Sequence, residues 1–164
     1  MSLHFDLAVA LDLKESTPEN VIDAIGYLVG TREAAPTDLP DHEFFRDPDW
    51  YKILQAKSEA THCPGDLYKT FRKALRFRRQ GVDHYRFTFA FRCYMLDDEF
   101  NEVFYPLVEW LALHSETKGF VGHYREQLSW WPTLIFFKGG EVYFRDGKEP
   151  PTPMRKEAPP WLSG

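Results

Sequence analysis

The sequence has little of what marks a disulfide-rich, secreted or membrane-spanning chain. Only two cysteines, Cys63 and Cys93, occur in 164 residues, and there is no Asn-x-Ser/Thr site for N-glycosylation. Two thiols cannot build a disulfide scaffold, so that class of protein is excluded. The first segment has no basic stretch leading into an apolar run, because Asp6 and Asp12 interrupt its hydrophobic positions. We therefore expect no secretion signal, no membrane partner and a reducing, cytoplasmic location.

The residue spacings of common metal sites and nucleophile motifs are also missing. No Cys-x-x-Cys or His-x-x-x-His pattern occurs, and the consecutive side chains from Asp41 to Glu43 do not converge on one ion without special loop geometry. His62 precedes Cys63, but adjacent residues rarely adopt the geometry of a base and its nucleophile. The sequence predicts no metal and no cofactor, and it leaves open whether the protein is an enzyme.

The composition is that of an acidic globular protein. Hydrophobic residues make up 43% and charged residues 27%, and the formal net charge is -5. A net negative chain repels nucleic acid and anionic lipid, so we expect neither as a partner. The length suits a single α+β domain over residues 1–145, followed by a proline-rich tail over residues 146–164.

The first third of the chain predicts a strand, a helix and a long insertion. Apolar residues occupy alternate positions from Leu3 to Leu13, which is typical of a half-buried strand. Thr17 is the expected N-cap and Pro18 the first residue of a helical pattern that ends at Gly30. Residues 31–66 are acidic and rich in proline, with a short helix after Asp47, and form either a lid or partner surface or, as we favour, an aromatic cap on the core.

The remaining pattern predicts two hairpins and a second helix. Residues 70–79 fit either a helix or a strand, and the turn-like break at residues 80–83 favours a strand paired with residues 85–95. A helix capped by Asp97 or Asp98 follows, with a kink expected at Pro106. Residues 119–126 predict a strand, and residues 133–137 and 141–144 predict a terminal hairpin around two glycines.

This order resembles the ferredoxin-like βαββαβ plan. The resemblance implies an antiparallel sheet with two helices on one face, extended here by the insertion at residues 31–66 and by an extra C-terminal hairpin. Many unrelated functions use this plan, so it implies no activity.

Alternation along residues 85–95 identifies the sheet face that is available for function. The odd residues from Tyr85 to Met95 are apolar and should face the helices, which leaves the even residues on the opposite, open face. We expect Asp6 and Asp12 to pair there with Arg86 and Arg92 across neighbouring strands. These pairs would frame a floor of small residues made by Ala8, Ala10, Thr88 and Ala90.

Three interpretations of this floor remain. It is a solvated sheet face, the seat of a second copy in a homodimer, or a site for a small anionic molecule. Our first hypothesis is a non-enzymatic association domain that dimerises through the open face. The alternative is a small-molecule enzyme or sensor, with an anion held by Arg86, Arg92 and Arg125 and covered by the insertion carrying Trp50. Tyr94 and Trp130 complete the candidate binding residues.

Overall fold

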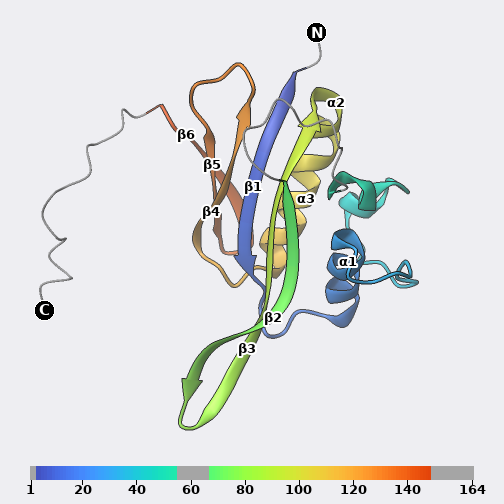
Figure 1. Ribbon diagram of the computed structural model, residues 1–164, viewed down its shortest axis with the longest axis vertical. Coiled ribbons are helices and arrows are strands. Elements are labelled where there is room, and N and C mark those ends of the chain that lie inside the picture. The colour runs from blue at the N-terminus through green and yellow to red at the C-terminus, as the bar shows by residue number, and fades with distance from the viewer. Residues whose placement is uncertain (1–2, 55–66, 149–164) are drawn as a thin grey trace, which may run out of the picture.

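The computed structural model describes residues 3–54 and 67–148, which form a six-stranded antiparallel sheet with helices on one side (Figure 1). The strand order is β2-β3-β1-β4-β5-β6. The strands are β1 (His4–Asp12), β2 (Tyr68–Arg79), β3 (Val82–Leu96), β4 (Gly119–Glu126), β5 (Thr133–Lys138) and β6 (Glu141–Asp146). The helical segments are α1 (Glu19–Val29), η1 (Glu43–Phe45), η2 (Trp50–Leu54), α2 (Asp97–Glu99), η3 (Phe100–Phe104) and α3 (Tyr105–His114).

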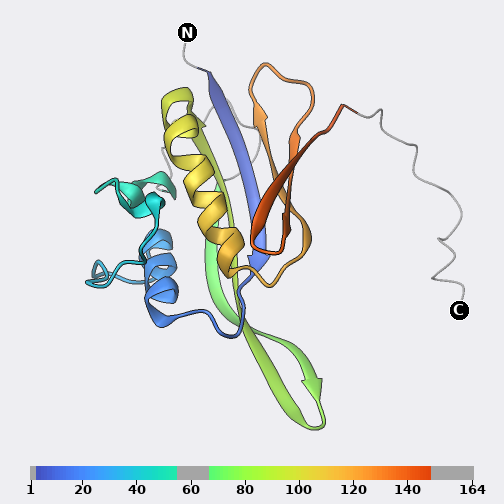
Figure 2. The same cartoon turned by 180° about the vertical axis from the view of Figure 1, so that it is seen from behind.

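The odd residues of β1, and those of β3 from Phe89 to Met95, form the core, as their alternation predicts. Tyr85 was also expected on this face, but it is exposed because it lies past the end of β1. Leu7 lies opposite Cys93, Val9 lies opposite Phe91, and all four side chains are buried. Buried residues of α1 and α3 belong to the same hydrophobic cluster, so both helices cover this face (Figure 2). Burial of each large apolar side chain contributes about 1.5–3 kcal/mol, which makes this layer the main source of stability.

The first helix ends where the sequence predicts and begins one residue later. Gly30 adopts the left-handed conformation (φ 79°) and its N–H bonds back to the Tyr27 carbonyl, a conformation that glycine reaches without steric cost. Thr17 was expected as the N-cap, but Pro18 occupies that position and the Thr17 hydroxyl donates to the Lys14 carbonyl instead.

The second helix passes Pro106 through a π-helical turn. Residues Phe100–Phe104 are π-helical and connect α2 to α3, with Pro106 in the first turn of α3. A proline has no N–H to donate and its ring crowds the preceding turn, which the wider π turn accommodates. The expected caps Asp97 and Asp98 are wrong: Leu96 is the N-cap, and its N–H donates to the Glu99 carboxylate at 3.1 Å.

The insertion caps the core with aromatic rings, which is the interpretation that we favoured. Phe44 stacks on Trp110 of α3 with 5.5 Å between ring centroids, and Trp50 packs edge-on against Phe45 at 4.9 Å. Of the predicted insertion, residues 55–66, including His62 and Cys63, lie outside the described residues, as does the tail from residue 149.

The β2–β3 hairpin confirms the choice of strand over helix for residues 70–79. Gln80 and Gly81 form its turn with φ values of 50° and 79°. β1 pairs with β3 only from Thr88 onward, so the hairpin continues past the end of the sheet as a two-stranded ribbon (Figure 1). We define residues 73–86 as the ribbon.

Among the described residues, no helix is long and apolar enough to cross a membrane.

Candidate functional site

The candidate site is the sheet face opposite the helices, at the centre of β1 and β3. Ala10 lies directly opposite Ala90, and Ala8 lies opposite Arg92. Because side chains alternate along a strand, Asp6 and Asp12 share this face with the two alanines. The expected small-residue floor is present, with Ala10 exposed and Ala8, Thr88 and Ala90 half-buried.

One end of the floor is closed by the predicted pair of Asp6 and Arg92. The Arg92 guanidinium donates from Nε and Nη2 to the two Asp6 oxygens at 2.9 and 2.8 Å. Arg125 of β4 approaches the same carboxylate from the other side, with its Nη2 at 3.9 Å. Asp6 is 6% exposed, so these two arginines rather than water balance its negative charge.

The other end of the floor differs from the sequence-based expectation. Asp12 is paired with Arg76 of β2, not with Arg86. Arg76 lies at a β-bulge between Leu75 and Phe77. Arg86 lies beyond the end of β1 and faces Glu116, whose carboxylate is 3.6 Å from the guanidinium. The open face therefore carries four arginine-carboxylate contacts, so each of these arginines already faces a carboxylate.

Tyr94 is not an exposed wall of the site, although it was a candidate. It is 9% exposed and its ring stacks on His4 at 4.9 Å. His4 in turn contacts the Gln127 side chain through Nδ1 at 2.7 Å. This end of the face is therefore closed by side-chain packing.

His123 lies on the same face, opposite Ala8 on β4. Burial of its ring lowers the pKa below the ordinary 6.5, the nearby Asp6 carboxylate raises it, and Arg92 and Arg125 lower it further. The imidazole is consequently neutral at physiological pH.

The open face continues into an aromatic patch that the sequence-based analysis missed. Phe120 of β4 packs edge-on against Phe136 of β5, with 5.8 Å between ring centroids. Tyr143 of β6 lies opposite Phe136, and the Arg145 guanidinium stands 5.6 Å from the Phe136 ring centre. Phe120 and Tyr143 are 55% and 47% exposed. The signal was present in the alternation of residues 134–138, but a second bulge between Phe120 and Gly122 obscured it in β4.

Of the two candidate tryptophans, Trp50 lies on the opposite side of the sheet from this face. Trp50 is 5% exposed and packs with Tyr27 of α1 on the helical side of the sheet, so it cannot cover Arg86, Arg92 and Arg125. Trp130 lies in the β4–β5 connection and is 90% exposed.

Comparison with protein-family models, with curated proteins and with solved structures finds no match to this chain. The geometry of the described residues therefore carries the functional argument.

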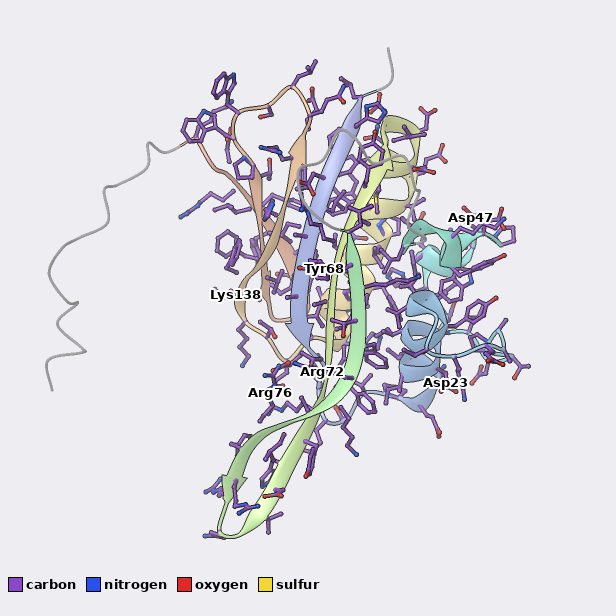
Figure 3. The ribbon with its side chains drawn as sticks, viewed as in Figure 1. Asp23, Asp47, Tyr68, Arg72, Arg76 and Lys138 are labelled. Carbon is purple, nitrogen blue, oxygen red and sulfur yellow. The ribbon has the colours of Figure 1, made fainter. Side chains whose placement is uncertain are left out.

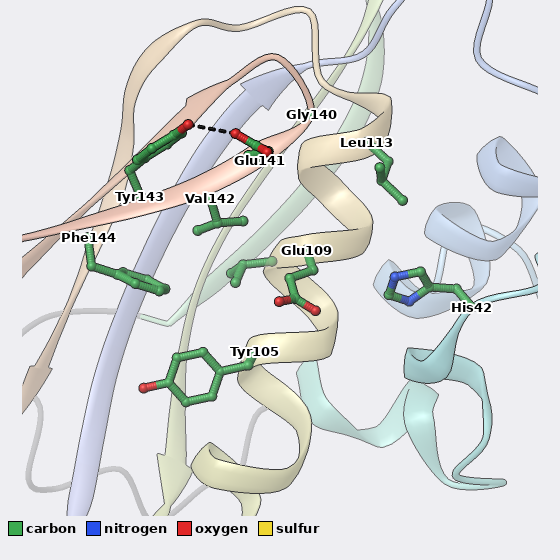
Figure 4. A pocket seen from close by; sticks show the side chains of 10 residues that line it. His42, Tyr105, Glu109, Leu113, Gly140, Glu141, Val142, Tyr143 and Phe144 are labelled. Carbon is green, nitrogen blue, oxygen red and sulfur yellow. Dashed lines mark hydrogen bonds between the residues drawn. The ribbon is translucent and has the colours of Figure 1, made fainter.

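A groove lies on the helical side of the sheet, between α3 and β6 (Figure 4). This groove has a volume of about 520 Å³, and Tyr105 and Phe144 point toward one another within it, with ring centroids 5.8 Å apart. Burial and the neighbouring Tyr124 raise the Tyr105 pKa above its ordinary value, so the hydroxyl keeps its proton. Glu109 supplies a carboxylate to the groove.

Within residues 3–54 and 67–148, no group of three or more His, Cys, Asp and Glu side chains could hold a metal ion.

Proposed function

We propose that this protein is a non-enzymatic association domain that forms a homodimer through its open sheet face. The supporting observation is the continuity of that face, where a floor of small residues around Ala10 passes into the exposed rings of Phe120 and Tyr143. Small side chains let a second surface approach closely, and exposed aromatic rings contribute apolar area that a partner would bury. A two-fold axis through such a face pairs it with itself.

The charges around the floor favour a protein surface over an anion. Arg92, Arg76 and Arg86 each face a carboxylate, so an anionic ligand would have to displace Asp6, Asp12 or Glu116. A partner protein can accept these pairs as a satisfied polar rim.

The anion-binding alternative retains one supporting observation. Arg125 is 3.9 Å from an Asp6 carboxylate that Arg92 already holds with two bonds, so its guanidinium has capacity for another acceptor. If this second function holds, phosphate or a small carboxylate at millimolar concentration raises the melting temperature, and Arg125→Gln removes the shift.

We also propose that β1 to β4 with the two helices follow the ferredoxin-like plan. Support comes from the neighbours of β1, which are β3 on one side and β4 on the other, with β2 beyond β3. The β5–β6 hairpin then extends the plan to the six strands observed.

The dimer is tested by placing a large charged side chain on the floor. Ala10→Arg should shift the protein from dimer to monomer in light scattering, while the circular dichroism spectrum stays close to that of the parent. Ser16→Arg is the matched control, because Ser16 is also exposed but lies in the turn between β1 and α1, outside both proposed contact surfaces. A parent protein that is monomeric at every concentration contradicts the proposal.

A further inference from the structure

The ribbon, residues 73–86, extends without a further neighbouring strand, and the ion pairs of Arg76 with Asp12 and of Arg86 with Glu116 hold only its base. Past the end of β1, its two strands pair only with each other (Figure 1). A two-stranded hairpin alone is at best marginally stable in water. The length of this hairpin is therefore not explained by the core of its own chain.

The ribbon also exposes apolar side chains that a solvated arm does not require. Its four large apolar residues each expose 46–58% of their surface: Leu75, Phe77, Val82 and Tyr85. Phe77 stacks on His84 across the hairpin at 4.5 Å, which presents a flat ring pair to the exterior. Exposed aromatic surface of this kind is enriched in protein interfaces.

The charge of the ribbon is opposite to that of the rest of the chain. It contains five Lys or Arg residues and one Asp, a net charge of +4, whereas the whole chain carries -5. Three of the cations are paired within the chain: Arg76 with Asp12, Arg78 with Asp83 and Arg86 with Glu116. Among the described residues, Lys73 and Arg79 have no carboxylate partner. Lys73 instead lies 5.9 Å from the Tyr85 ring centre.

A complementary surface exists on the same chain but out of reach of its own ribbon. We define residues 33–49 as the acidic segment, which holds six Asp or Glu residues and one Arg, a net charge of -5. Asp47 of this segment lies well apart from Arg76 in Figure 3, on the far side of α1. Among the described contacts, no ion pair links the ribbon to the acidic segment. Asp41 and Glu43 are exposed there.

We propose that the ribbon of one protomer binds the acidic segment of a second copy of this chain, and that the contact is reciprocal. A two-fold arrangement lets each ribbon reach the partner's acidic segment, so both contacts close within one dimer. The inference rests on the self-association proposed above but uses a different surface from the floor around Ala10.

The test uses charge reversal on each surface and then a mixture. Lys73→Glu with Arg79→Glu reverses the free cations of the ribbon, and Asp41→Lys with Glu43→Lys reverses part of the acidic segment. Each double variant alone should weaken the dimer by about tenfold or more in analytical ultracentrifugation at low salt, because like charges then meet. An equimolar mixture of the two variants should recover most of the parent affinity as a heterodimer. High salt should weaken the parent contact.

The control outcomes separate this contact from the floor. A parent dimer that survives Ala10→Arg but not the charge reversals supports the ribbon contact and contradicts the open-face dimer. A dimer that Ala10→Arg abolishes but both reversals leave intact overturns the ribbon contact alone. A mixture that does not recover affinity also overturns it. Binding of a 20-base-pair DNA duplex that the ribbon reversal abolishes, with self-association unchanged, would show a nucleic-acid arm instead.

Discussion

Arg92 donates two hydrogen bonds to the Asp6 carboxylate across the β1–β3 pair, from Nε and Nη2 at 2.9 and 2.8 Å. The two residues are diagonal neighbours in the ladder, since Asp6 lies opposite Tyr94 and Arg92 lies opposite Ala8. Their side chains are 8% and 18% exposed, so the pair is largely desolvated on a face that is otherwise open. Such a pair sets the orientation of both side chains more firmly than a surface ion pair does.

Removal of the Asp6 charge should destabilise the fold. Asp6→Asn leaves Arg92 without that carboxylate in a largely buried position, and we expect a loss of about 2–4 kcal/mol in the free energy of unfolding. Urea denaturation measures it. Asp83→Asn, which breaks the exposed pair with Arg78, is the control and should cost much less. Equal losses at the two positions would contradict the desolvated character of the Asp6 pair.

His123 should make stability depend on pH. Its pKa in the folded protein lies below the ordinary 6.5, chiefly because of burial and despite the nearby Asp6. Between these two values the unfolded chain binds the proton more tightly, so this histidine reduces stability as the pH falls from 6.5 toward the folded pKa. Above pH 6.5 this loss of stability is absent.

His123→Gln should therefore flatten part of the pH dependence. The free energy of unfolding of the parent relative to that of the variant should be greater at about pH 7.5 than at about pH 5. His114→Gln should show the same sign, because burial and Lys14 lower the pKa of that ring as well. If the free energy of unfolding of the parent, relative to that of either variant, increased as the pH falls, the direction of the pKa shift would be contradicted.

Gly122 should tolerate no side chain. A Cβ built on this residue would stand 2.0 Å from the Ala8 carbonyl oxygen, so the β1–β4 pair would have to move apart. We expect Gly122→Ala to cost more than about 3 kcal/mol or to prevent folding, since backbone cannot yield as a side chain does. Gly26→Ala in α1 is the matched control. Its Cβ would meet Thr31 Oγ1 at 3.4 Å, and the change should be neutral or stabilising by up to about 1 kcal/mol.

Phe91 and Phe77 should respond very differently to truncation. Phe91 is fully buried beneath the helices, and Phe91→Ala should cost about 3–5 kcal/mol through the cavity that it leaves. Phe77 is 46% exposed on the ribbon, and Phe77→Ala should cost less than about 1 kcal/mol. Thermal unfolding of both variants tests the alternation of β3. A small effect at Phe91 would contradict the assignment of that face to the core.

Local chemistry in the sequence determined most of the element types. Alternation in β1 and β3 predicted which side chains enter the core, because successive side chains of a strand point to opposite faces. The turn at Gln80 and Gly81 decided between strand and helix for β2, since such a turn joins two strands directly. The Asp6 pair with Arg92 followed from the same alternation and the neighbouring positions of β1 and β3.

Tertiary structure decided the features that depend on where strands end and bend. Asp12 pairs with Arg76, which lies at a bulge in β2, rather than with Arg86, and a single inserted residue leaves no mark in the hydrophobic pattern. Trp50 turned toward α1 and the core, where its large apolar surface is buried, instead of covering the arginines. The free length of the ribbon was likewise decided in three dimensions, because a strand's own residues do not record where its neighbour stops.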